Sequence, residues 1–414
     1  MKHGIKKISV VVLYYPIATM LAFAAMYFHI RNGIYVTAIL VYFTLNQVIK
    51  LIKNINITVI SVTTILIFSY IIYCLIGFSF AVFNGYSLSI SIREAANGLI
   101  PVFFFYYALS IPKYESIVFE KMFIVSCSVL IISGILYNIN ISDPFYIKYL
   151  TDVYPNFSLH GFKLFPRLTS TVGSVIIGSI SCFSTVFAFL HVSMNKKARS
   201  NIVFIILSVF GALLSMQRSA FIAVTVNTIL CLRELGKQGY FKKWQIYGLV
   251  SGFFVLIIIL FVQNEVLLNT LIKRLISFNS AISERSSAWT YAWGNSFFET
   301  IFGRGYGVGG HRAIGHGITI NDGNYFKMIY EMGILGFALF FIIVFSSIIK
   351  GRISCKEGRF YLIALYGVLF QAIGSNVLTF QMISPLFWYC IGRIEKFSQK
   401  SSIVSVPTVM GYSL

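Results

Sequence analysis

The side chains best able to do chemistry gather in residues 264–333, one long polar stretch in an otherwise apolar chain. The stretch holds two of the six histidines, His311 and His316, and two of the four tryptophans, and it is rich in glycine over 303–323. Arginine and aspartate accompany them, so the segment offers groups that bind anions and groups that move protons. We interpret it as a catalytic or substrate-binding loop, framed by the apolar runs on either side.

Arg218 is the most informative single residue outside that stretch. It lies in a short polar break, residues 215–219, between two apolar runs that are each barely long enough to span a bilayer. A charge near hydrocarbon depth costs roughly 2.5–3.5 kcal/mol on insertion scales, so such a residue usually faces a polar cavity. We predict that Arg218 faces a site, the alternative being an interfacial arginine at a tight turn.

Two further arginines in the polar stretch have suggestive neighbours. Arg285 and Trp289 are four residues apart, which places them on one face of a helix. Arg304 lies between two glycines, which let backbone approach a ligand closely. The alternative for Arg285 is an ion pair with Glu284 or Glu299.

Asp322, His311 and His316 are the acid–base candidates. An aspartate before a helix is also a good N-cap, and a lone histidine in a loop often has no catalytic part. No metal-ligand spacing, phosphate-binding loop, paired-carboxylate motif or serine-hydrolase elbow appears in the sequence. We therefore expect no metal and no cofactor, and a substrate that arrives already activated.

The elements that must position these groups are membrane helices. The chain is 57% hydrophobic and 11% charged, whereas soluble domains carry about 25% charge. About 20 apolar residues span a bilayer as a helix, and no strand alternation recurs. The first apolar run is long for a signal peptide, so we expect a retained span. The expected spans, about twelve, are 8–28, 34–52, 57–83, 95–111, 122–137, 169–192, 201–216, 219–232, 245–263, 324–349, 360–380 and 382–392.

The distribution of basic residues predicts the topology. With the N-terminus inside, 21 of the 33 basic residues fall in inner segments, as the positive-inside rule requires. The net charge of +20 is thereby explained without nucleic acid. Both termini are then cytoplasmic, and residues 1–414 form a single membrane domain. Two long loops, about 138–168 and 264–323, lie outside.

Arginine is preferred over lysine on the outer side. The inner segments hold five arginines and sixteen lysines, whereas the outer residues comprise eight arginines and four lysines. Guanidinium binds phosphate in a fixed two-pronged geometry that an ammonium group does not reproduce. The bias therefore predicts a phosphate or pyrophosphate ligand at the outer face. Charged residues avoid the centres of the expected spans and no internal repeat is visible, which makes a transporter the less favoured class.

Three segments resemble the superfamily of O-antigen polymerases (Wzy type) and O-antigen ligases. They are Gln-Arg-Ser-Ala at 217–220, the pair Arg285 and Trp289 followed by the glycines of 303–307, and the helix pattern of 324–336. The resemblance covers roughly residues 200–340. Ligases usually carry a His-Asn pair where this chain has Asp322 and Gly323, and the aspartate is more similar to polymerases.

The resemblance implies an all-α, GT-C-like fold with a large periplasmic loop before the third-last helix. It also implies polymerisation of undecaprenyl-pyrophosphate-linked oligosaccharide repeat units by metal-independent, inverting glycosyl transfer. The catalytic residues it implies are Arg218, Arg285, Asp322 and His316. The residues it implies for binding pyrophosphate or glycan are Arg304, Arg312, His311, Trp289, Asn324 and Tyr325, with Trp293 and Tyr306 as further surfaces for stacking on sugars.

In this reading Arg218 and Arg285 bind the pyrophosphate, and Asp322 or a histidine receives the acceptor's proton. The same lipid-linked repeat unit serves as donor and acceptor in the inner membrane of a bacterium, and the family implies a partner that regulates chain length. A ligase that transfers the glycan to lipid A core, and a transporter or flippase of the lipid-linked glycan, remain alternatives. The sequence leaves open whether the product is O-antigen or capsule.

Overall fold

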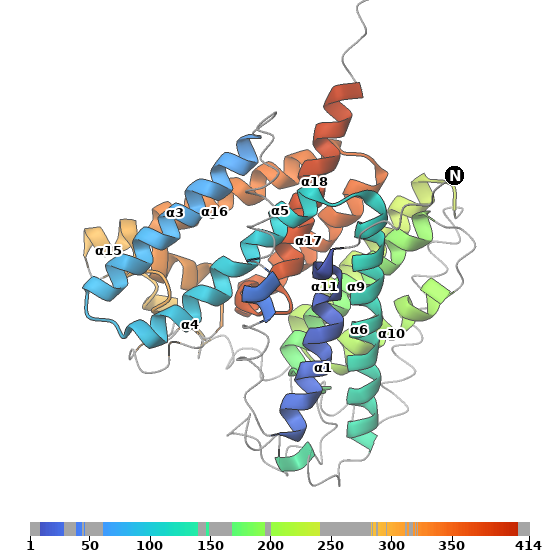
Figure 1. The fold of residues 1–414 in the computed structure, drawn as a ribbon, viewed down its shortest axis with the longest axis horizontal. Helices are drawn as coiled ribbons and strands as arrows, with labels where there is room; N and C mark the ends of the chain where they lie inside the picture. Colours follow the sequence, from blue (N-terminus) through green and yellow to red (C-terminus); the bar gives the residue numbers. More distant parts are fainter. Residues whose placement is uncertain are drawn as a thin grey trace, which may run out of the picture.

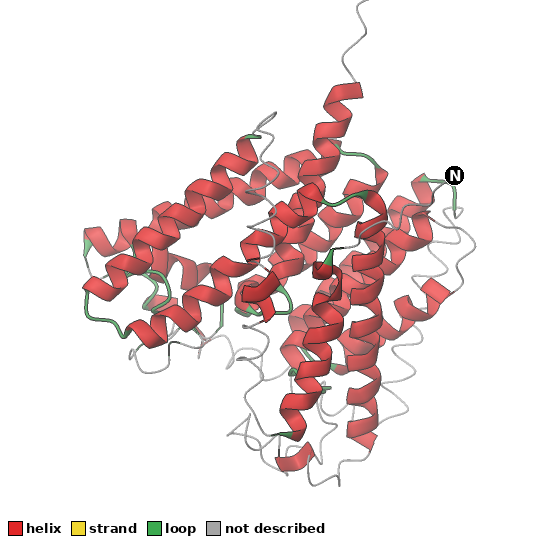
Figure 2. Ribbon diagram, in the orientation of Figure 1, coloured by secondary structure: helices red, strands yellow, loops and turns green. Residues whose placement is uncertain are grey.

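The computed structural model describes residues 9–28, 39–43, 45, 61–139, 146–148, 168–194, 200–240, 283, 285–286, 289–294, 296–310, 313, 318, 320 and 322–404. Every regular element in these ranges is a helix (Figure 2). The helices are η1 (Val10–Leu13), α1 (Tyr14–Tyr27), α3 (Val62–Phe83), α4 (Leu88–Leu99), η2 (Ile100–Val102), α5 (Phe103–Ser110), α6 (Lys113–Ile139), α9 (Ser174–Met194), α10 (Ser200–Leu214), α11 (Arg218–Lys237), α15 (Phe297–Phe302), α16 (Asn324–Ile353), α17 (Lys356–Gly374), η3 (Val377–Thr379) and α18 (Ser384–Val404).

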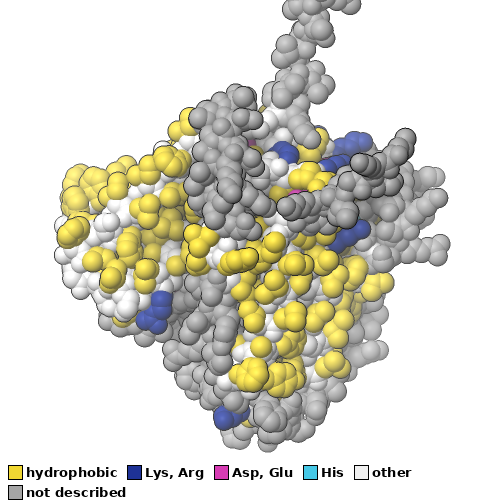
Figure 3. Space-filling view, in the orientation of Figure 1, with side chains coloured by type: hydrophobic (Ala, Val, Ile, Leu, Met, Phe, Trp, Pro, Cys, Tyr) yellow, Lys and Arg dark blue, Asp and Glu magenta, His cyan; other side chains and the backbone are white. Residues whose placement is uncertain are grey.

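The chain is a multi-pass α-helical membrane protein, as the sequence predicts. Within the described residues, 7 helices or continuous helix pairs are long and apolar enough to cross a bilayer. Hydrophobic side chains cover much of the described surface on the face shown in Figure 3. On α3, for example, Phe68 and Ile76 are exposed. The expected span at 245–263 lies outside the described residues, and only part of 34–52 is described. The count of about twelve spans therefore stays a prediction.

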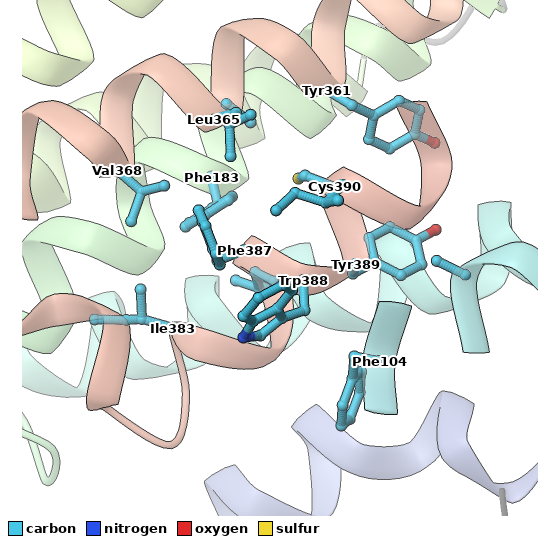
Figure 4. Close-up of a cluster of buried hydrophobic side chains, with 14 of the residues drawn as sticks. Phe104, Phe183, Tyr361, Leu365, Val368, Ile383, Phe387, Trp388, Tyr389 and Cys390 are labelled. Carbon is cyan, nitrogen blue, oxygen red and sulfur yellow. The ribbon is translucent and has the colours of Figure 1, made fainter. Parts of the chain in front are cut away.

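The helices form two groups joined by a central pair (Figure 1). On one side α3, α4, α15 and α16 pack together, and on the other α1, α6, α9 and α10 form a bundle. Between them, α17 packs on α9, α11 and α16, while α18 packs on α5 and α17. Apolar and aromatic side chains of α18, among them Phe387 and Trp388, fill the centre against Phe183 and Leu365 (Figure 4).

Local sequence signals explain where several helices begin and bend. The Ser61 hydroxyl accepts a hydrogen bond from the Thr64 amide at 3.2 Å and caps α3. Pro101 has no amide hydrogen to donate, and it divides one long span, Leu88–Ser110, into α4, η2 and α5. The expected start of that span, residue 95, was too late because the helix continues back through the charged pair Arg93 and Glu94.

Helix α16 is interrupted at Gly333, whose φ of 63° and ψ of −171° lie outside the helical region. The interruption leaves carbonyl groups without helical partners, and neighbouring segments supply the donors. The amide of Arg304 donates to the Tyr330 carbonyl at 3.0 Å, and the amide of Gly305 donates to the Glu331 carbonyl at 3.0 Å. The Tyr73 hydroxyl donates to the Met332 carbonyl at 2.8 Å. Loop 303–305 therefore takes the place of the missing helical turn.

Segments that the sequence assigns to the inner side contact one another at one end of the helices. Lysine and arginine side chains there pair with glutamates from other helices, as expected for segments that share a membrane face. The ion pairs are Lys113–Glu357 (2.5 Å), Lys350–Glu395 (2.7 Å) and Arg359–Glu234 (3.2 Å).

Candidate functional site

The first element of the site is the tight turn between α10 and α11. Met216 has a φ of 53°, a left-handed conformation that is uncommon for a residue with a side chain. Ser215 and Met216 are buried, and the Gln217 side-chain amide donates to the Ser375 hydroxyl at 3.3 Å, which ties the turn to the end of α17. Arg218 is the first residue of α11 and lies half-buried beyond this turn.

The second element is an ion pair between the large loop and the start of α16. Arg285 Nε donates to Asp322 Oδ2 at 3.0 Å, and both side chains are partly exposed, at 38% and 43%. Asp322 is not the N-cap of α16, since Gly323 occupies that position without a side-chain cap. Arg285 pairs with Asp322 and not with Glu299, so neither the N-cap role of Asp322 nor the Arg285–Glu299 pair holds in the structure. Glu284, the other alternative partner of Arg285, lies outside the described residues.

Trp289 fixes the backbone on which Asp322 sits. Its indole Nε1 donates to the Asp322 carbonyl at 2.7 Å, and its ring stacks on Phe326 with centroids 4.4 Å apart and planes within 8°. Gly323 has a φ of 105°, and an added Cβ there would lie 2.8 Å from the Trp289 nitrogen. One face of the Trp289 ring is therefore occupied by protein, and its observed role is to hold residues 322–323.

Arg285 pairs with Asp322, and the turn that carries Arg218 contacts the end of α17, although the three residues come from distant segments. A Cβ at Gly374 would lie 3.8 Å from Arg285 Nη1, so Arg285 also borders the end of α17 that Gln217 contacts. Two guanidinium groups and one carboxylate carry a net positive charge, which suits an anion that takes two-pronged hydrogen bonds.

Arg304 belongs to a different contact group. Its Nε donates to Glu299 Oε2 at 3.2 Å, and its guanidinium carbon lies 4.7 Å from the centre of the Tyr330 ring. These contacts fix the side chain against α15 and α16 and give it a structural role at the interrupted helix. Tyr306, expected as a stacking surface, is buried.

Asn324 and Tyr325, which the resemblance assigns to substrate, anchor α16 to its neighbours. Asn324 is fully buried, and its Oδ1 accepts a hydrogen bond from the Leu378 amide at 2.9 Å. The Tyr325 hydroxyl donates to the Leu369 carbonyl at 2.7 Å. The remaining predicted residues, His311, Arg312 and His316, lie outside the described residues.

A buried charged cluster between α4 and α16 escaped the sequence reasoning. Lys327, which the sequence places among the outer basic residues, forms an ion pair with Glu94 and lies 3.7 Å from Glu331. All three side chains are almost completely buried. The spacing of Lys327 and Glu331, four residues apart on a helix, was visible in the sequence, but such pairs usually lie on surfaces.

A second buried cluster lies around Glu120 of α6. Its Oε1 accepts hydrogen bonds from the hydroxyls of Tyr361 (2.5 Å), Tyr389 (2.8 Å) and Ser116 (2.9 Å), and its Oε2 lies 3.4 Å from His191 Nε2. Glu94, Glu120 and Glu331 all lie about two turns inside membrane-spanning helices. Charges thus reach further into the spans than the sequence pattern indicates, and each is neutralised or hydrogen-bonded there.

The sequence matches no protein-family model, and a search of curated proteins finds no match. Among the described residues, no group of three or more histidine, cysteine, aspartate or glutamate side chains is arranged to hold a metal ion.

Proposed function

We propose that this chain is a glycosyltransferase that polymerises undecaprenyl-pyrophosphate-linked oligosaccharide repeat units into O-antigen or capsular polysaccharide. One observation carries the proposal: Arg285 pairs with Asp322 beside the end of α17, and the turn that carries Arg218 contacts the same end of α17. Pyrophosphate is the leaving group of such a donor, and paired arginines match its charge and geometry. The carboxylate beside them provides a proton acceptor within the same site.

The chemical step in this proposal is a single displacement with inversion. A hydroxyl oxygen at the non-reducing end of the acceptor repeat unit attacks the anomeric carbon of the growing glycan. The bond between that carbon and the pyrophosphate oxygen breaks, and the electron pair leaves with the lipid pyrophosphate. Arg218 and Arg285 stabilise this negative charge. Asp322 takes the hydroxyl proton, after the pyrophosphate has replaced it as the partner of Arg285.

The orientation of the helices supports placing this chemistry at the outer face. Helices α11, α16 and α17 each have one end at the site and the other at the lysine-rich end of the molecule. By the positive-inside rule the lysine-rich end is cytoplasmic, so the site faces the periplasm. Both termini in the cytoplasm, about twelve spans, a GT-C-like fold and a partner that regulates chain length belong to the same proposal.

The test uses purified protein in liposomes with one lipid-pyrophosphate-linked repeat unit and nothing else. A ladder of glycan lengths on a gel is the expected product. Arg218→Lys and Arg285→Lys keep the charge but lose the two-pronged contact, so we expect each to lower the rate by roughly 10²-fold or more. The matched control is Arg93→Lys on α4, an exposed arginine whose Nε donates to the Ser89 carbonyl away from the site. It should leave the ladder unchanged.

The alternatives predict different products in the same assay. A ligase gives no ladder and transfers glycan only when lipid A core is added. A transporter gives no glycosidic product and moves the lipid across the bilayer. A normal ladder from Arg218→Lys would remove Arg218 from the pyrophosphate site and with it the main support for the proposal.

A further inference from the structure

The cluster of Glu94, Lys327 and Glu331 contains one ammonium group between two carboxylates. Lys327 Nζ forms a close ion pair with Glu94 Oε1, whereas Glu331 Oε2 lies 3.7 Å away, beyond hydrogen-bond range. The Lys327 side chain is 4% exposed and both carboxylate side chains are 2% exposed. The positive charge of Lys327 therefore compensates mainly the charge of Glu94, and its electrostatic interaction with Glu331 is weaker.

Among the residues that the structure describes, the groups that face Glu331 from the surrounding elements include no second cation. Helix α3 presents Tyr70 and Cys74, and loop 303–310 presents Tyr306. Burial raises the pKa of Tyr306 well above its ordinary range, so its hydroxyl stays neutral. Among the described residues, the Gly309 amide donates to Glu331 Oε1 at 2.9 Å and the Gly307 backbone also hydrogen-bonds this carboxylate. With both glutamates ionised the cluster still buries one net negative charge, which is costly, whereas one bound proton makes the cluster neutral.

A small cavity borders Glu331 and gives the proton a polar environment. It lies between α16, α18 and η3 and is lined by Lys327, Glu331, Asn324, Tyr306 and Trp388. Asn324 is fully buried, and its Nδ2 has no hydrogen-bond partner within the described part of the chain. A buried donor of this kind favours an acceptor inside the cavity, such as a water molecule, and water next to a carboxyl group can carry a proton.

We propose that Glu331, with Lys327 and Glu94, forms a binding site for one proton within the membrane-spanning part of the protein. The proton is shared by the carboxyl groups of Glu94 and Glu331 and resides chiefly on Glu331, because Lys327 forms its close ion pair with Glu94. When the proton leaves, Glu331 becomes a second negative charge that competes with Glu94 for Lys327, and the packing of α4 on α16 weakens. The inference does not rest on the proposed glycosyl transfer.

Infrared difference spectroscopy of the purified protein between neutral and alkaline pH tests the site directly. A protonated carboxyl group gives a C=O stretching band that disappears on deprotonation. The wild type should lose one such band as pH rises, and Glu331→Gln should lack it at every pH. Glu94→Gln should also lack it, although Glu331 is intact, because Lys327 is then free to pair with Glu331 as a carboxylate.

Two controls separate this outcome from misfolding and from binding of another cation. Glu299→Gln changes a glutamate whose partner is Arg304, outside the cavity, and it should keep the band. Hydrogen exchange in α4 should increase at alkaline pH in the wild type and not in Glu94→Gln. A band that persists in Glu331→Gln would overturn the assignment. A wild type that lacks the band and whose spectrum changes when sodium is replaced by choline at fixed pH would also overturn it. That result would show that the site binds sodium in place of a proton.

Discussion

Replacing Gly333 with alanine tests how loop 303–305 completes the interrupted helix. The residue has a φ of 63° and a ψ of −171°, a region that is essentially restricted to glycine and costs other residues about 1–3 kcal/mol. An added Cβ would lie 2.2 Å from the Ile301 carbonyl oxygen and 2.6 Å from the Gly303 nitrogen. These are backbone atoms that cannot rotate away, so the loop must separate from α16.

The magnitude follows from what is lost when the loop moves. The two hydrogen bonds from the amides of Arg304 and Gly305 contribute about 0.5–1.5 kcal/mol each. With the backbone strain, we expect Gly333→Ala to lower the free energy of unfolding by about 2–6 kcal/mol. The matched control is Gly85→Ala, because Gly85 has a φ of 83° but no atom within 4 Å of an added Cβ. It should show the strain alone, about 1–2 kcal/mol.

The cysteines provide the assay. Cys355 is exposed and the other five are buried, so in a Cys355→Ser background a thiol-reactive dye reports unfolding. Gly333→Ala should become reactive at a clearly lower temperature than Gly85→Ala. Equal midpoints for the two variants would refute the reasoning, because they would show that the contact with residues 301–303 adds nothing to the strain.

Three further variants have defined expectations. Arg285 and Asp322 are partly exposed, so a double-mutant cycle on their ion pair should give a coupling of about 0.5 kcal/mol or less in thermal unfolding, and a much larger value would make the pair structural. Trp289→Phe keeps the stacking on Phe326 but removes the 2.7 Å hydrogen bond to the Asp322 carbonyl, so glycan synthesis should fall while stability drops by only about 1 kcal/mol. Tyr73→Phe removes the donor to the Met332 carbonyl and should cost about 1 kcal/mol in the dye assay without affecting the initial rate of synthesis.

The sequence singles out Arg218, Arg285, Trp289 and Asp322 as candidates, because each is a polar or aromatic residue next to apolar or glycine-rich segments. Their meeting in the structure was not visible in the sequence, since it depends on how α11, α16 and α17 pack. The arginine bias predicts an anion site at the helix ends where Arg218 and Arg285 lie, and this stays a prediction. The bias does not distinguish Arg304 from the arginines at the site, although Arg304 pairs with Glu299 and lies over the Tyr330 ring.

The buried charges explain most of what the sequence did not predict. Glu94 marked an apparent end of an apolar run, yet the helix continues through it because Lys327, more than 200 residues later, neutralises it. Likewise α17 begins at Lys356, ahead of the expected residue 360, because Glu357 and Arg359 find partners on other helices. A hydropathy pattern treats a charge as exposed to lipid, whereas a folded bundle provides the partner that makes its burial tolerable.

The interruption of α16 has a consequence for the order in which the protein is made. The donors to the carbonyls of residues 330–332 are Arg304, Gly305 and Tyr73, and all three precede Gly333 in the chain. Gly309 and Glu94, the partners of Glu331 and Lys327, precede it as well. When α16 leaves the ribosome, the groups that satisfy its interruption and that pair with Lys327 and Glu331 have already been synthesised. The contacts of its first turn with α17 and η3, and the ion pair of Lys350 with Glu395, wait for the rest of the chain.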